Sequence, residues 1–231
     1  MLNLADRSSG VKAFRLDMDA NGQPFVIHAA LLWDEQEAIL VDTGIPGQLE
    51  LIRSRLEEES IPFERLTKVI ITHQDRDHIG GLPELLQASG DRLEVLAHET
   101  AIPYITGETP LIKSKALAPP LPAAVTPLHD GELLPIAGGI RILHTPGHTP
   151  DHISLYHMPS KTLITGDALT SQEGVLQSFD PKFTLDTDLA MQSVAKFLEL
   201  EIDRVITYHG GVCDDQIKER LHAILANKTS V

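Results

Sequence analysis

Residues 69–81, VIITHQDRDHIGG, join a short apolar run to a dense group of side chains that can bind metal ions or protons. His73, Asp75 and Asp77 recur with a period of two, so an extended segment would place them on one side. His78 follows at once, and a turn there can direct it elsewhere. Two imidazoles and two carboxylates suit zinc, iron or manganese. The alternative is a capped turn, with the aspartates capping the next helix and the histidines at the surface.

Three later segments favour the metal site over the capped turn. Each places a ligand type shortly after a strand-like apolar run: His148 in ILHTPGHTPDHISLY, Asp167 in TLITGDAL and His209 in RVITYHGG. Small residues beside them let the backbone approach closely, and rigid strand ends hold site residues precisely. Four segments that end in this way are hard to explain as helix caps.

Apolar periodicity predicts a sandwich of two sheets with helices outside, within one domain that covers residues 1–231. The expected strands are 24–33, 38–41, 68–72, 93–97, 139–143, 153–157, 162–165 and 204–207, and the expected helices are 47–59, 82–88, 187–200 and 214–226. The proline-rich segment at about 100–127 predicts a long loop, which we interpret as a lid beside the active site. Its two bases, Lys113 and Lys115, are expected to be solvated.

The composition of the chain limits which kinds of partner it can bind and in which cellular compartment we expect it. The formal net charge of −14, from 33 acids and 19 bases, argues against nucleic-acid and anionic-membrane partners. The one cysteine, Cys213, cannot form an intrachain disulfide and is expected to be buried. The chain shows neither a signal pattern nor an apolar run of about 18 residues, so we expect a cytoplasmic protein. Phosphate-loop, dinucleotide and G-x-S-x-G motifs do not occur.

The motifs together resemble the metallo-β-lactamase superfamily of binuclear metallohydrolases. The matching pieces are VDTG at 41–44, THQDRDHIGG at 72–81, TPGHTPDH at 145–152, TGD at 165–167 and YHGG at 208–211. The resemblance implies an α+β fold, an αββα four-layer sandwich of two mixed β-sheets flanked by helices, with metal ions in a cleft at one edge. It also suggests a homodimer.

The resemblance assigns a role to each candidate residue. One metal ion would be bound by His73, Asp75 and His148. A second ion would be bound by Asp77, His78 and His209, and Asp167 would bridge the two ions. Asp42 and His152 would lie behind the ligands and support them. Asp77 would also be catalytic, by orienting the nucleophile or moving its proton.

One position departs from the family pattern. The usual motif is H-x-H-x-D-H, and here Asp75 stands in place of the second histidine. A carboxylate adds negative charge and shifts preference from zinc toward iron or manganese. The flavodiiron branch of the superfamily, which uses iron, also has a carboxylate there. Alternatively, Asp75 ligates poorly and leaves a site for one ion.

We therefore expect a hydrolase with two divalent metal ions that directs a metal-bound hydroxide at an ester, thioester or lactone of a small cytoplasmic molecule. Hydroxyacylglutathione hydrolases resemble this core but usually carry a basic C-terminal extension. Lactonases of acyl-homoserine lactones carry a tyrosine where this chain has Thr170. The alternatives from other classes are an iron-binding redox protein of flavodiiron type and a metal-binding sensor without catalysis.

Overall fold

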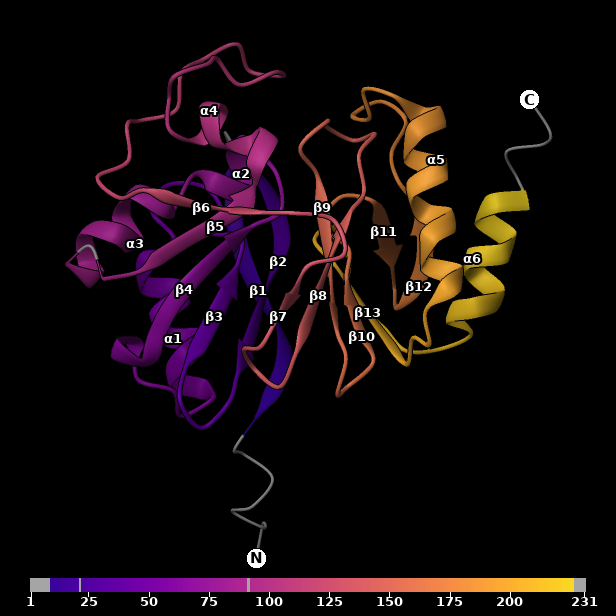
Figure 1. Ribbon diagram of the computed structural model, residues 1–231, viewed down its shortest axis with the longest axis horizontal. Coiled ribbons are helices and arrows are strands. Elements are labelled where there is room, and N and C mark those ends of the chain that lie inside the picture. Colours follow the sequence, from indigo (N-terminus) through magenta and orange to yellow (C-terminus); the bar gives the residue numbers. More distant parts are fainter. Residues whose placement is uncertain (1–8, 21, 91, 227–231) are drawn as a thin grey trace, which may run out of the picture.

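The computed structural model describes residues 9–20, 22–90 and 92–226. Two six-stranded sheets stack face to face, and helices cover the outer face of each (Figure 1). The sheets are mixed, because each contains parallel and antiparallel neighbours. This is the α+β four-layer sandwich that the family resemblance implied.

The first sheet has the strand order β1-β2-β3-β4-β5-β6. Its strands are β1 (Gly10–Ala20), β2 (Gln23–Trp33), β3 (Ala38–Val41), β4 (Leu66–Ile71), β5 (Glu94–His98) and β6 (Val125–Leu128). The first three pair antiparallel, and β3 to β6 pair parallel. The helices of this half are α1 (Leu49–Glu58), η2 (Phe63–Arg65), α2 (Arg76–Ile79), α3 (Leu82–Ser89), η3 (Glu99–Ala101) and α4 (Ile102–Ile105).

The second sheet has the order β14-β13-β10-β9-β8-β7. Its strands are β7 (Leu133–Leu134), β8 (Ile140–His144), β9 (Ile153–His157), β10 (Thr162–Ile164), β13 (Arg204–Thr207) and β14 (Gly211–Cys213). The hairpin of β11 (Leu169–Gln172) and β12 (Val175–Ser178) forms a separate small sheet. The helices are α5 (Thr187–Ala195), η4 (Lys196–Glu199) and α6 (Ile217–Ala226). Across the described ranges, no helix is long and apolar enough to cross a membrane.

The hydrophobic core follows from the alternation of side chains along the strands. On β2, Ile27 and Leu31 pack in the layer between the first sheet and its helices, while Ala30 and Leu32 pack between the two sheets. A third apolar cluster joins the second sheet to α5 and α6, and it includes the buried Cys213. Each fully buried leucine or isoleucine stabilises the fold by about 1.5–3 kcal/mol.

Several elements differ from the sequence-based expectation. The long edge strand β1 was not expected, because charged residues alternate along it with its buried residues Phe14, Leu16 and Met18. The helix expected at 187–200 ends its α-helical part at Ala195 and continues as a 3-10 helix. The segment expected to be a long loop contains the short helix α4 and the start of β6.

The strand directions bring the motifs to one edge of the sandwich. Strands β3 and β4 are parallel, so Asp42 and the segment that begins at Thr72 leave the sheet at the same end. Strands β10 and β13 are also parallel, which places Asp167 and His209 together. His148 lies in the connection between β8 and β9.

Candidate metal centre

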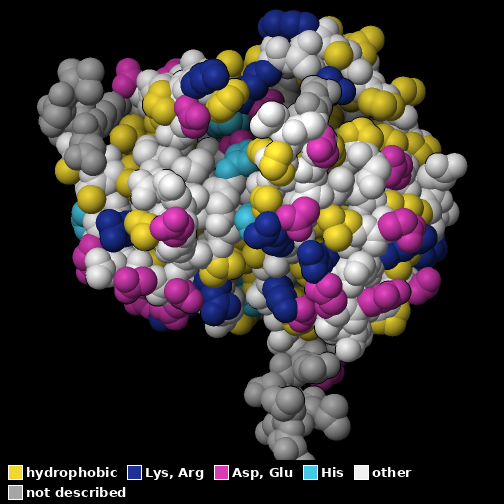
Figure 2. Space-filling model, turned by 180° about the vertical axis from the view of Figure 1, so that it is seen from behind, with side chains coloured by type: hydrophobic (Ala, Val, Ile, Leu, Met, Phe, Trp, Pro, Cys, Tyr) yellow, Lys and Arg dark blue, Asp and Glu magenta, His cyan; other side chains and the backbone are white. Residues whose placement is uncertain are grey.

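All seven predicted ligands meet at this edge of the sheets. They form two groups in which the donor atoms lie within 4.8 Å of one another: His73, Asp75, His148 and Asp167, called here the first group, and Asp77, His78 and His209, called here the second group. Figure 2 shows histidine side chains inside a hollow of the surface. Residues that are far apart in the sequence therefore lie together in one compact cluster.

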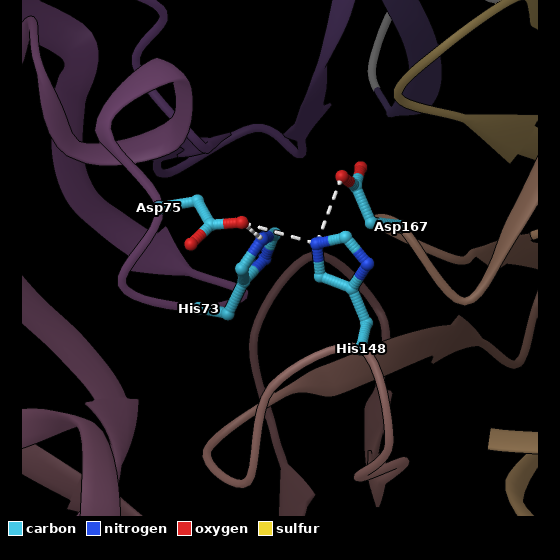
Figure 3. Close-up of side chains that lie close together, drawn as sticks. All are labelled: His73, Asp75, His148 and Asp167. Carbon is cyan, nitrogen blue, oxygen red and sulfur yellow. Dashed lines mark hydrogen bonds and ion pairs between the residues drawn. The ribbon is translucent and has the colours of Figure 1, made fainter. Parts of the chain in front are cut away.

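The first group is built around two carboxylates and two imidazoles (Figure 3). Asp75 Oδ2 is 3.1 Å from His148 Nε2 and 3.3 Å from His73 Nε2. His148 Nε2 is also 3.2 Å from Asp167 Oδ2. The donor atoms of the four side chains converge, and Asp75 Oδ2 contacts both histidines.

The histidines of the second group also contact Asp167. His78 Nε2 is 3.8 Å from Asp77 Oδ2 and 3.4 Å from Asp167 Oδ1. His209 Nε2 is 3.6 Å from Asp77 Oδ2 and 3.4 Å from Asp167 Oδ2. Because Asp167 reaches both groups with its two oxygens, it stands where a bridging ligand would stand.

Several buried nitrogen and oxygen atoms of the two groups have no hydrogen-bond partner, which suits the binding of a divalent cation. Among the described residues, His73 Nε2, His78 Nε2 and Asp167 Oδ1 are buried without a hydrogen bond. Leaving such groups unsatisfied costs about 1–3 kcal/mol each. Imidazole nitrogens and carboxylate oxygens that converge in this way are the donor set of zinc, iron or manganese sites.

The capped-turn alternative is wrong for this motif. The helix expected near Gly81 is α3, which has Gly81 itself at its N-cap position and no side-chain capping hydrogen bond. Asp75 occupies the N-cap position of α2, and its side chain makes no capping hydrogen bond either. His73 and His78 are fully buried instead of lying at the surface. Their burial beside carboxylates requires the polar partners that the two groups supply.

Opposite charges dominate the ionisation of the cluster. Burial would raise the pKa of Asp167, but the charges of His78 and His209 hold it well below its usual range. Burial would lower the pKa of His78, but Asp42, Asp167 and Asp77 raise it well above its usual value. A metal ion would replace the proton of His78 as the positive partner of these carboxylates.

Asp42 and His152 lie behind the ligands, as the family resemblance implies. Asp42 Oδ2 accepts a hydrogen bond from His78 Nδ1 at 2.9 Å, which leaves His78 Nε2 free to face the second group. His152 Nε2 accepts from the backbone N–H of Asp167 at 3.0 Å. Burial and the charges of His73 and His148 lower the pKa of His152 well below its usual value, which keeps it neutral and able to accept.

Three further residues shape the site although the sequence analysis did not single them out. Gln74 donates to both carboxylate oxygens of Asp151, from its backbone N–H at 2.9 Å and from its side chain at 3.1 Å. Tyr208 stacks on His78 with ring centroids 3.7 Å apart, and its hydroxyl donates to the carbonyl oxygen of Asp77. The available signal was their position inside or next to the ligand motifs.

Lys113 corrects an expectation. It was expected to be solvated, but its Nζ lies 2.5 Å from Asp75 Oδ2 and 2.6 Å from His148 Nε2. Burial alone would raise the pKa of Asp75, whereas His73, His148 and Lys113 together lower it below its usual range. Lys115 is exposed, as expected.

A cavity of about 630 Å³ opens over both groups. Its apolar walls include Phe25, Leu111 and Phe183, and Arg76 and Lys113 contribute positive charge. The volume falls in the range of small-molecule sites, about 300–1,000 Å³. The proline-rich segment borders this cavity through Leu111 and its neighbours, and its closure as a lid stays a prediction.

A comparison with known protein families shows which family this chain belongs to. The family described as the metallo-beta-lactamase superfamily matches residues 22–209. The chain belongs to this superfamily. Its members typically bind divalent metal ions, which agrees with the two groups described above.

Curated relatives in the superfamily are named as hydrolases. The probable metallo-hydrolase YflN of Bacillus subtilis is 30% identical over 74% of this chain and 75% of its own length. The hydroxyacylglutathione hydrolase GloC of Haemophilus influenzae is 28% identical over 89% of this chain and 95% of its own length. The prediction of a metallo-hydrolase enzyme agrees with both names.

Solved structures support the fold independently. A metallo-beta-lactamase family protein from Thermus thermophilus superposes with a TM-score of 0.73 over 96% of this chain and 80% of its own, at 22% identity. An archaeal superfamily protein from Sulfolobus tokodaii gives a TM-score of 0.66 over 96% of this chain and 86% of its own, at 19% identity. The shared fold accounts for the two-sheet arrangement that gathers the ligands.

Proposed function

We propose that this protein is a metal-dependent hydrolase of an ester, thioester or lactone of a small molecule. The observation that carries the proposal is the pair of histidine–carboxylate groups, joined by Asp167, beneath a cavity of small-molecule size. A divalent ion bound there would polarise the carbonyl group and lower the pKa of bound water toward about 7.

The residues of the second group would hold the ion that supplies the attacking water. His78 and His209 present their Nε2 atoms toward Asp77 and Asp167. Asp77 lines the cavity, and its side chain is 28% exposed, so it can reach both the ion and a substrate. We assign Asp77 the role of orienting the water and accepting its proton, as a general base does.

The cavity lining suggests the substrate class. Phe25, Leu111 and Phe183 offer apolar contacts to an acyl chain, while Arg76 and Lys113 offer positive charge to a polar or anionic end. The relative named as a hydroxyacylglutathione hydrolase makes a hydroxyacyl thioester of glutathione the first candidate. Aryl esters and homoserine lactones are the comparison substrates.

The donor set supports up to two ions per chain. Zinc suits the histidines, and the carboxylate of Asp75 favours iron or manganese at the first group. A homodimer, a cytoplasmic location and the lack of nucleic-acid or membrane partners stay predictions.

The test is hydrolysis by protein stripped with a chelator and reloaded with zinc, manganese or iron. We expect stripped protein to be inactive and reloaded protein to hydrolyse one of the three substrate classes. Asp77→Asn should lower kcat by about 10²–10⁴, whereas Asp180→Asn, at a cavity residue outside both groups, should retain most of it.

Loaded protein that hydrolyses none of the three classes would contradict the proposal. An iron redox protein or a metal sensor would give that result, so the same assay separates the rival classes.

A further inference from the structure

Lys113 shares the donor atoms of the first group. Its Nζ lies 2.5 Å from Asp75 Oδ2 and 2.6 Å from His148 Nε2, the atoms that a metal ion in this group would take. A neutral imidazole nitrogen has one lone pair, so His148 Nε2 can accept from an ammonium group or ligate a metal ion, but not both. The positive charge of Lys113 therefore competes with a metal ion for the same position.

The backbone around Lys113 is fixed to the metal-binding motif itself. The N–H of Ile112 donates to Gln74 Oε1 at 2.7 Å. Gln74 is in turn held by two hydrogen bonds to Asp151, and all its atoms are buried. Leu111, which precedes Ile112, is buried in the core. The ammonium is thus delivered to the first group by an anchored turn.

The carboxylate of Asp75 is the kind of partner that the ammonium group of Lys113 requires at this place. A carboxylate pairs with an ammonium group through a short, charge-assisted hydrogen bond, which a histidine at position 75 would supply only weakly. The side chain of Asp75 is 13% exposed and that of Lys113 is 25% exposed, so water screens this pair less than a surface pair. Among the described residues, no lysine or arginine forms an ion pair with Asp77 of the second group.

We propose that the ammonium group of Lys113 takes the place of the first metal ion. The chain then binds one divalent ion tightly, at the second group with Asp167, and admits another only when Lys113 leaves Asp75 and His148. In the one-ion form the ammonium lines the cavity and donates a hydrogen bond to the substrate oxygen where a metal ion would otherwise polarise it. The catalytic part of this inference rests on the proposed function.

The test is a zinc titration against a competing chromophoric chelator, with the wild type and Lys113→Met. The wild type should bind one zinc ion per chain tightly and a second far more weakly. In Lys113→Met the second zinc ion should bind about 10-fold tighter or more, since removing one charge-assisted bond shifts an equilibrium by about that factor. The first zinc ion should bind as in the wild type.

Lys115→Met is the matched control, because it removes the same charge from the same segment at an exposed position. It should titrate like the wild type. Circular dichroism checks folding, and Lys113→Gln replaces the methionine variant if that variant does not fold.

Three results would overturn the inference: two equally tight zinc ions in the wild type, an unchanged second ion in Lys113→Met, or the same gain in Lys115→Met. The titration contains no substrate, so it is independent of turnover. A protein that binds zinc as described but hydrolyses nothing would refute the proposed function and the catalytic part of this inference, while the replacement of the first metal ion by Lys113 would stand.

Discussion

The substitution Asp42→Asn tests how much the carboxylate of Asp42 contributes to metal binding by His78. Asp42 has a φ of +63°, a conformation that asparagine adopts more readily than most residues, so the backbone should not change. Its Oδ1 accepts from the Thr72 N–H at 2.8 Å, and its Oδ2 accepts from Thr72 Oγ1 at 2.8 Å and from His78 Nδ1 at 2.9 Å. The amide of asparagine has one oxygen, which can accept the hydrogen bond of only one side of the carboxylate. Its NH₂ group then faces the remaining donors and cannot accept from them.

The expected loss follows from the tautomer of His78. An amide NH₂ group beside Nδ1 favours the tautomer that carries the proton on Nε2, and that atom faces Asp77 and Asp167. Removing the support of a ligating histidine weakens metal binding about 10–100-fold. That factor corresponds to about 1.4–2.8 kcal/mol.

The assay is the dissociation constant of the tightly bound zinc ion, measured by competition with a chelator. Asp17→Asn is the control, since Asp17 is an exposed acid of β1. A dissociation constant for Asp42→Asn within two-fold of the wild type, in folded protein, would refute the role assigned to Asp42.

Three further predictions concern the ligands. Asp167→Ala should weaken the binding of both the tight and the weak zinc ion because Asp167 contacts each group, and wild-type affinities for both ions in a chelator titration would exclude a bridging role. Asp75→His should shift metal preference toward zinc and tighten the second zinc ion, and an unchanged metal profile would mean that Asp75 does not contribute. Despite burial, the charges of Asp42, Asp167 and Asp77 raise the pKa of His78 well above its usual value, so zinc must displace a proton from His78, and zinc binding should release protons and weaken as the pH falls. Calorimetry in buffers of different ionisation enthalpy measures the release, and no proton released at pH 7 would contradict it.

The sequence, together with its resemblance to the superfamily, was sufficient to predict the fold class and the residues that meet in the two groups. Short apolar runs marked the central strands, and residues such as His209 and Asp167 followed them at the ends where parallel strands meet. Strand β1 was harder to recognise, because it lies at the edge of its sheet and alternates charged with apolar residues.

The place of Lys113 could not be predicted from local patterns. It depends on hydrogen bonds between Gln74 and two partners far away in the chain, Ile112 and Asp151. Proline content indicated only that the segment lacks regular structure. Long-range contacts of this kind become visible only when the folded chain is known.

The most direct test of the central claim is one titration that records zinc bound per chain and hydrolysis of a hydroxyacylglutathione thioester, an aryl ester and a homoserine lactone in the same samples. The account predicts no activity in stripped protein and a rate for one of these substrates that rises in proportion to zinc up to one ion per chain. Equal activity in stripped protein, or no activity toward any of the three in fully loaded protein, would contradict it.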